Sequence, residues 1–298
     1  MLHLNTNKIV ITTDFSETSY LAIKHGAFLA QYTKGEIYLV HIITKHWEKF
    51  NVFTPSITLE NIEKASEAVQ SKLNELASDI KNQYGVKVTT VVNSGNPTTE
   101  IVRVAKELKA DLIVMGTHGY SSWEDLTIGS NALKVLTKSH CPVLTMSQQA
   151  ESLGYHKIVL PIDTSEHSRH KVVLTMELAK QFAAHVYAVG LLTEDEASKK
   201  PAMEVMLNQV ANAAKDKGVA FSSELLENVK NRAVATVKYC EKVGGDLISI
   251  MTDQDAELSG FFLGPYALQV IHHSKVPVLS VKPEEHPENV SWTMLSGT

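Results

Sequence analysis

The sequence predicts an α/β protein made of two tandem, doubly wound, five-stranded parallel-sheet domains. The first observation is an internal repeat, because KIVITTDFSE at 8–17 returns as KIVLPIDTSE at 157–166 with six of ten positions identical. The segment 133–144 also returns, at 268–279, with six identities in twelve positions. The second is that the apolar runs are continuous, which is typical of parallel strands covered on both faces. The third is the length of 298 residues, which suits two domains of about 150 residues.

The elements of the first copy follow from apolar periodicity and from helix start signals. The run 8–13 is short, apolar and β-branched, and Ser16 and Glu17 then open a helix that carries small apolar residues at helical spacing. The run 36–43 is a second strand, and 59–84 has apolar residues three or four positions apart, which predicts an amphipathic helix. The remaining elements are expected to be a strand at 86–92, a helix at 97–108, a strand at 111–115, a helix at 131–139 and a strand at 142–146.

The spacing of the repeat gives the domain organisation. Asp14 and Asp163 are 149 positions apart, whereas Pro142 and Pro277 are 135 apart, so the second copy is 14 residues shorter between Ile43 and Gly85. We expect domains at 1–148 and 154–283, and a tail at 284–298. The connecting stretch is short, so the domains are expected to pack together. The tail is either disordered or laid on the body with Trp292 as its anchor.

Composition disfavours several classes of function. The net charge of -5 and the lack of a Lys/Arg cluster argue against nucleic-acid and membrane-surface partners. The two cysteines, Cys141 and Cys240, form no CxxC motif, which fits buried apolar roles in a reducing compartment. No signal peptide is evident and no apolar run approaches the ~18 residues of a membrane span, so a cytoplasmic location is expected. The adjacent pair His272 and His273 points about 100° apart on a helix, which disfavours a zinc site.

A glycine pattern in the first copy predicts an anion site. Gly116 and Gly119 follow the strand at 111–115, and after nine more residues Gly129 and Ser130 open a helix. Glycines let backbone N–H groups approach phosphate oxygens and can take positive φ, and a helix N-terminus favours negative charge. Asp14, at the end of the first strand, is a natural partner for ribose or adenine. Neither a GxxxxGK[ST] loop nor a GxGxxG fingerprint occurs.

This sequence resembles the ATP-binding branch of the universal stress protein family. The resemblance rests on the pattern Gly-x2-Gly-x9-Gly-Ser, the opening Asp-Phe-Ser-Glu and the closing Pro-Val-Leu. The resemblance implies an adenine nucleotide alpha hydrolase-like fold that binds ATP, with Mg²⁺, as its cofactor. It covers the first copy fully and the second more weakly. Ile42, or its neighbour His41, would contact the nucleotide through the main chain. The site residues that the resemblance implies are Thr13, Asp14, Ile42, Met115, Gly116, His118, Gly119, Gly129, Ser130 and Asn131.

The second copy departs from the pattern at the phosphate end. Thr252 and Asp255 are read as the counterparts of Gly116 and Gly119, Pro265 replaces Ser130, and Lys230 stands in place of Gly95. Asn231 keeps the place of Asn96, and Asp163 keeps that of Asp14. We therefore expect no triphosphate binding there. The second pocket is either empty or reused, with Asp163, Asp253 and Asp255 as a hard-cation or sugar site.

Three functions remain open. The preferred one is an ATP-dependent regulatory role in stress response, with the two domains paired through the strands at 143–146 and 278–281 as a built-in dimer, and a homodimer of chains also possible. The alternative is a slow ATP hydrolase or adenylyl-transfer enzyme, which the lack of lysine and arginine in the glycine loop disfavours. The third is an interaction module that binds no nucleotide. Glu124 and Asp125 could contact a metal, but no catalytic residue and no metal ligand is assigned.

Overall fold

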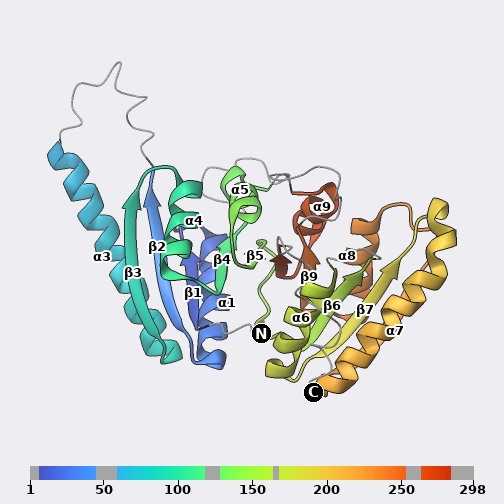
Figure 1. Cartoon of the computed structure of the whole chain (residues 1–298). Coiled ribbons are helices and arrows are strands. Elements are labelled where there is room, and N and C mark those ends of the chain that lie inside the picture. The colour runs from blue at the N-terminus through green and yellow to red at the C-terminus, as the bar shows by residue number, and fades with distance from the viewer. Residues whose placement is uncertain (1–6, 45–58, 118–127, 164–167, 253–262, 283–298) are drawn as a thin grey trace.

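A computed structural model describes residues 7–44, 59–117, 128–163, 168–252 and 263–282 of the chain. The strands of both halves form one ten-stranded sheet, with the order β3-β2-β1-β4-β5-β10-β9-β6-β7-β8. Figure 1 shows the two halves side by side, with β5 and β10 near the centre and α3 and α7 at opposite sides. The strands are β1 (Lys8–Thr12), β2 (Glu36–Ile43), β3 (Lys87–Ser94), β4 (Leu112–Gly116), β5 (Val143–Met146), β6 (Lys157–Ile162), β7 (His185–Leu191), β8 (Ala220–Leu226), β9 (Leu247–Met251) and β10 (Val278–Val281).

Every strand pair within a half is parallel. The two halves meet through an antiparallel pair, in which Leu144 of β5 lies opposite Leu279 of β10. In each half the first strand lies between the second and the fourth, so the strand order reverses beside it. These observations confirm the predicted fold class of two tandem, doubly wound parallel sheets.

Helices cover both faces of the sheet, which explains why the strands are apolar throughout. One buried cluster joins residues of α1, α3, α6 and α7 to one face, and a second joins α4, α5, α8 and α9 to the other. The helices are α1 (Glu17–Thr33), α3 (Leu59–Tyr84), α4 (Pro97–Leu108), α5 (Ser130–Lys138), α6 (Ser168–Phe182), the 3₁₀ turn η1 (Glu194–Lys199), α7 (Lys200–Lys217), α8 (Arg232–Val243) and α9 (Pro265–His273).

The expected elements occur close to where periodicity placed them. The ranges 36–43, 59–84 and 97–108 match β2, α3 and α4 at both ends. The largest difference is β3, which extends to Ser94 because it pairs with β2 along its whole length, up to Ile43 opposite Ser94. Pairing with β2 therefore sets the C-terminal end of β3, and local composition does not reveal this pairing.

The connection between the halves is anchored in the core by Ala150 and Tyr155. Ala150 and Tyr155 are buried, and His25 of α1 bonds both the Ala150 carbonyl and the Tyr155 hydroxyl. Cys141 and Cys240 are buried free thiols, as expected from their positions. The tail at 284–298, with Trp292, lies outside the described residues. Among the helices that are described, none combines the length and apolar character needed to cross a membrane.

Candidate functional site

A cavity of about 460 Å³ lies at the carboxyl edge of the sheet in the first half. Residues at the ends of β1, β2 and β4 line it, together with the first residues of α4 and α5. Ligands of doubly wound folds bind at this edge, where the strand order reverses. The cavity therefore has the position that a nucleotide pocket requires.

Eight of the ten site residues implied by the sequence line this one cavity. They come from four segments that are distant in the chain, and the fold brings the segments together. The eight are Thr13, Asp14, Ile42, Met115, Gly116, Gly129, Ser130 and Asn131. The other two, His118 and Gly119, lie outside the described residues, as do Glu124 and Asp125.

The turn after β1 holds Asp14 in a defined orientation. Its Oδ1 accepts hydrogen bonds from the Ser16 hydroxyl at 2.5 Å and the Ser16 N–H at 3.1 Å. The Thr13 hydroxyl accepts from the Phe15 N–H at 3.0 Å, and Phe15 has φ of 64°. A positive φ is unusual for an aromatic residue and marks a turn that its surroundings hold in place. The result is an exposed, oriented carboxylate at the cavity.

His41 and Lys72 flank this turn. His41 Nδ1 donates to the Thr13 carbonyl at 2.8 Å, and its ring stacks on Phe15 with centroids 4.8 Å apart. Burial lowers the pKa of His41, so the neutral ring with its proton on Nδ1 is favoured near neutral pH. Lys72 of α3 places its Nζ 4.4 Å from the centre of the Phe15 ring. Sequence reasoning missed this lysine because it lies far along the chain from the glycine loop.

The start of α5 offers the anion-binding element. Gly129 is its N-cap and makes no side-chain cap hydrogen bond, so within the described residues the cap leaves the first-turn amides available to an acceptor. The Gly129 N–H donates to the Thr117 carbonyl at 2.7 Å, which ties the helix start to the end of β4. The positive end of the helix dipole and the Ser130 hydroxyl thus face the cavity region. Gly129 has φ of −57°, so positive φ is not the reason for glycine here.

Gly116 is a glycine because of packing. A Cβ at this position would lie 3.0 Å from the Cβ of Thr18 and 3.1 Å from its carbonyl carbon, both in the first turn of α1. Such contacts force a shift of the helix backbone, so a substitution at Gly116 perturbs packing as well as any ligand. Packing against α1 thus requires glycine at position 116, and the spacing of the glycines alone does not distinguish this requirement from phosphate binding.

The structure corrects the comparison of the two loops. The Thr117 N–H donates to the carbonyl of Met146, and the Thr252 N–H donates to that of Val281, at matching places in the two halves. Thr252 is therefore the counterpart of Thr117, and Met251 is that of Gly116. The interpretation of Thr252 as the counterpart of Gly116 was wrong by one residue.

The same correction applies to the counterpart of Gly119. Gly129 comes twelve positions after Thr117, and Gly264 likewise comes twelve positions after Thr252. This equal spacing aligns Gln254, in place of Asp255, with Gly119; Asp253, Gln254 and Asp255 lie outside the described residues.

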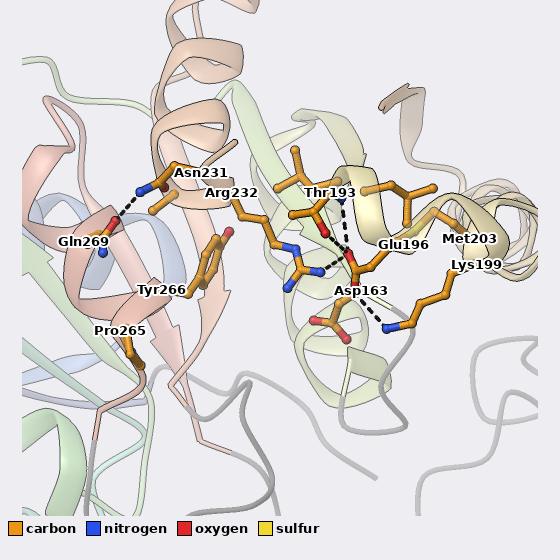
Figure 2. Close-up of a pocket in the computed structure, with 13 residues that line it drawn as sticks. Asp163, Thr193, Glu196, Lys199, Met203, Asn231, Arg232, Pro265, Tyr266 and Gln269 are labelled. Carbon is orange, nitrogen blue, oxygen red and sulfur yellow. Dashed lines mark hydrogen bonds and ion pairs between the residues drawn. The ribbon is translucent and has the colours of Figure 1, made fainter. Parts of the chain in front are cut away.

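A second cavity, of about 490 Å³, lies at the matching edge of the second half (Figure 2). Asp163 borders it, as its equivalence to Asp14 predicts. Pro265 at the start of α9 takes the place of Ser130, and Arg232 at the start of α8 takes that of Pro97. Charged and aromatic residues that sequence reasoning missed also line it, namely Glu196, Lys199, Arg232 and Tyr266.

Glu196 is the centre of an ion-pair network in this second cavity. Arg232 Nη2 and Lys199 Nζ both contact its carboxylate, the latter at 2.8 Å, and Thr193 completes a capping box with it. Burial raises the pKa of this carboxyl, but the hydrogen bonds from Arg232, Lys199 and Thr193 outweigh burial and lower the pKa to about 2. Glu196 is thus ionised throughout the physiological range.

A fully buried lysine lies behind Asp163. Lys171 Nζ donates to the Pro161 carbonyl at 2.6 Å and lies 3.8 Å from Asp163 Oδ2. Burial lowers the pKa of Lys171, and Asp163 opposes that shift. The equivalent position in the first half is Ala22, so this lysine belongs to the second half alone.

Comparison with known proteins gives consistent matches over both halves. The model of the universal stress protein family matches residues 5–146 and again 154–282. A universal stress protein of Methanocaldococcus jannaschii is 30% identical over 154 residues, covering 48% of this chain and 95% of the relative. One from Mycobacterium tuberculosis is 21% identical over 276 residues, covering 84% of this chain and 91% of the relative. The crystal structure of a universal stress protein from Archaeoglobus fulgidus covers 93% of this chain and 98% of its own, with a TM-score of 0.74 and 20% identity.

Proposed function

The chain belongs to the universal stress protein family, whose domain it carries twice, and from this premise we propose that domain 1–148 binds ATP and serves a cytoplasmic, regulatory stress-response role. The observation that carries the proposal is the convergence of eight sequence-implied residues on one cavity. An oriented carboxylate lies at one part of that cavity, and the N-terminus of α5, whose N-cap Gly129 has no side chain, lies at another. These groups suit the two ends of a nucleotide.

Each part of ATP has a matching group in the cavity. The apolar side chains of Val40, Ile42 and Ile101 suit the adenine ring, and Asp14 suits the ribose hydroxyls. The first-turn amides of α5 and the Ser130 hydroxyl suit the phosphates. A cavity of about 460 Å³ lies within the range of small-molecule sites.

The residues present fit Mg²⁺ when it arrives with the phosphates. Asp14 is the one carboxylate among the described residues that line the cavity. Within the described part of the chain, no three His, Cys, Asp or Glu side chains form a group able to hold an ion alone. Mg²⁺ commonly uses one or two carboxylates, phosphate oxygens and water, so we expect it to bind with the nucleotide.

Regulation by binding is favoured over turnover. No lysine or arginine occurs among the described residues lining this cavity, whereas phosphoryl transfer normally uses such cations to stabilise the transition state. Regulation requires that ATP bind one conformation of the first domain more tightly than another. The second domain, 154–283, would act as a built-in partner, which the β5–β10 pairing supports. The alternative, slow ATP hydrolysis or adenylyl transfer, predicts multiple-turnover release of phosphate or pyrophosphate.

Calorimetric titration of Mg·ATP into Ser130→Pro tests the proposal. Ser130 is the first residue of α5, where proline fits a helix and removes an amide donor. The second half already carries Pro265 at this place. A lost charge-assisted hydrogen bond corresponds to ~10–100-fold weaker binding. Ser130→Ala is the matched control, because it removes the hydroxyl and keeps the amide.

The outcomes separate the functions. Weaker binding in Ser130→Pro than in Ser130→Ala supports a phosphate site at α5. Equal affinity of wild type and Ser130→Pro contradicts that assignment. Absence of ATP binding to the wild-type chain points to the interaction module, and sustained phosphate release by the wild type points to the enzyme.

A further inference from the structure

The cavity of the second half keeps some features of the first and replaces others. Asp163 again lies at the end of the first strand, and Leu191 and Leu192 take the places of Ile42 and Ile43. The start of the last helix differs, because Pro265 has no N–H to donate. The carboxylate and the apolar wall thus persist, while the phosphate end is changed.

Tyr266 lines this cavity at the start of the last helix. It takes the place of Asn131, and its hydroxyl bonds the Thr236 hydroxyl at 2.9 Å, which fixes the ring against α8. Asn231, the N-cap of α8, also donates to Gln269 of α9 at 2.8 Å. The two helix starts are therefore tied together by side chains, and the last helix offers less to a phosphate chain than α5 does.

Arg232 supplies a cation at a new place in the cavity. It is the first residue of α8, and Figure 2 shows its guanidinium reaching from α8 toward Glu196 and Asp163. Its contact with Glu196 uses Nη2, whereas a guanidinium carries five N–H donors in a planar fork that suits phosphate oxygens. Glu196 also accepts from Lys199 and Thr193, so its charge does not depend on Arg232 alone.

The charged side chains of this cavity leave N–H donors for an anion. Among the described residues that line it, Lys199 and Arg232 are cations and Asp163 and Glu196 are carboxylates. Lys171, whose Nζ lies 3.8 Å from Asp163 Oδ2, is buried behind that carboxylate and does not line the cavity. Because Arg232 contacts Glu196 through Nη2, the other donors of its guanidinium remain for the oxygens of an anionic group.

We propose that the second domain binds a ribose monophosphate, free or as part of a nucleoside monophosphate, with the phosphate on Arg232 and the ribose hydroxyls on Asp163. The site differs from the ATP site proposed for the first domain, because its phosphate group lies at the start of α8 instead of the start of the last helix. Leu191, Leu192 and Met203 form an apolar wall that suits a base. Arg232 offers a contact to one phosphate, and Pro265 lacks the backbone N–H that would help to hold a longer phosphate chain. The site therefore matches one phosphate better than three.

The test is calorimetric titration of adenosine monophosphate and of ribose 5-phosphate into the full chain carrying Ser130→Pro, which weakens the first site. Adding Arg232→Gln to this background is expected to weaken binding of both probes at least ~10-fold, because one charge-assisted contact is lost. Lys238→Gln is the matched control, since Lys238 is exposed on the same helix and does not line the cavity. It is expected to leave affinity unchanged.

Each result decides the proposal. Equal affinity for the two probes identifies the free sugar phosphate as the ligand chemistry, and tighter binding of the nucleoside monophosphate identifies a contribution from the apolar wall; both support the site. Binding that Arg232→Gln leaves unchanged overturns it, as does the absence of binding to the Ser130→Pro chain. ATP affinity of the otherwise wild-type chain carrying Arg232→Gln reports on the first domain separately, so failure of one site does not mimic failure of the other.

Discussion

His25 is a buried histidine with both ring nitrogens in hydrogen bonds. Its Nε2 donates to the Ala150 carbonyl at 2.9 Å, so Nδ1 of the neutral ring accepts from the Tyr155 hydroxyl at 2.8 Å. The side chain is fully buried, and burial lowers its pKa below the ordinary 6.5. A single neutral tautomer therefore joins α1 to the segment between the halves.

This geometry predicts a pH dependence of stability. Between the lowered folded pKa of His25 and 6.5, the unfolded chain binds more protons, so the free energy of unfolding falls as pH falls through that window. His25→Phe removes this titration and is expected to flatten the dependence between pH 7.5 and 5. It also leaves the Ala150 carbonyl without its partner, at about 1–3 kcal/mol. Urea unfolding of both proteins across pH measures both effects, and an unchanged pH slope in the variant contradicts the assignment.

The helices after the third strand of each half begin in the same way. Asn96 caps α4 by accepting from the Thr99 N–H at 3.2 Å, and Asn231 caps α8 by accepting from the Val234 N–H at 3.0 Å. Each cap satisfies a backbone donor that the helix itself cannot. These caps place Pro97 and Arg232, the next residues, at the two cavities.

Loss of the Asn96 cap is expected to destabilise the chain without removing a cavity side chain. Asn96→Ala should lower the free energy of unfolding by about 1 kcal/mol, whereas Asn96→Asp keeps an acceptor and should cost less. Chemical denaturation measures both. Equal destabilisation by the two variants would show that the side-chain cap is not the source of the effect.

The two halves are joined by a shared sheet and by an aromatic cluster. Phe182 at the end of α6 stacks on Tyr32 of α1 with centroids 4.3 Å apart, and it also contacts Phe28 and Tyr155. Together with the β5–β10 pair, this contact makes the interface part of the protein core. We therefore expect the halves to unfold together.

Truncation of Phe182 should uncouple them. Phe182→Ala removes a buried ring and is expected to cost about 3–5 kcal/mol. Differential scanning calorimetry should then show two transitions where the wild type shows one. Phe221→Ala, on the outer strand β8, is the control, because it weakens the second half away from the interface. A single cooperative transition in Phe182→Ala would show that the remaining contacts, the β5–β10 pair among them, suffice to couple the halves.

The sequence by itself determined the fold class, most element ranges and eight residues of the first cavity. The reason is that these features are local: apolar periodicity marks strands and helices, and the residues just after parallel strands all reach the same edge of a sheet. Asp14 and Gly116 were found because they lie just after or at the end of a strand, whereas Ile42 was implied by the family resemblance. The domain limits at 148 and 154, and the ATP role of these residues, stay predictions.

The tertiary structure alone decided the contacts between distant side chains. Arg232 meets Glu196, and Lys171 lies behind Asp163, only because the fold brings separate elements together. The spacing of glycines likewise did not show that α1 packs on Gly116, nor that Met251 is its counterpart. Such contacts depend on packing between elements and leave no periodic signal along the chain, so the chemistry of the second cavity became visible only in three dimensions.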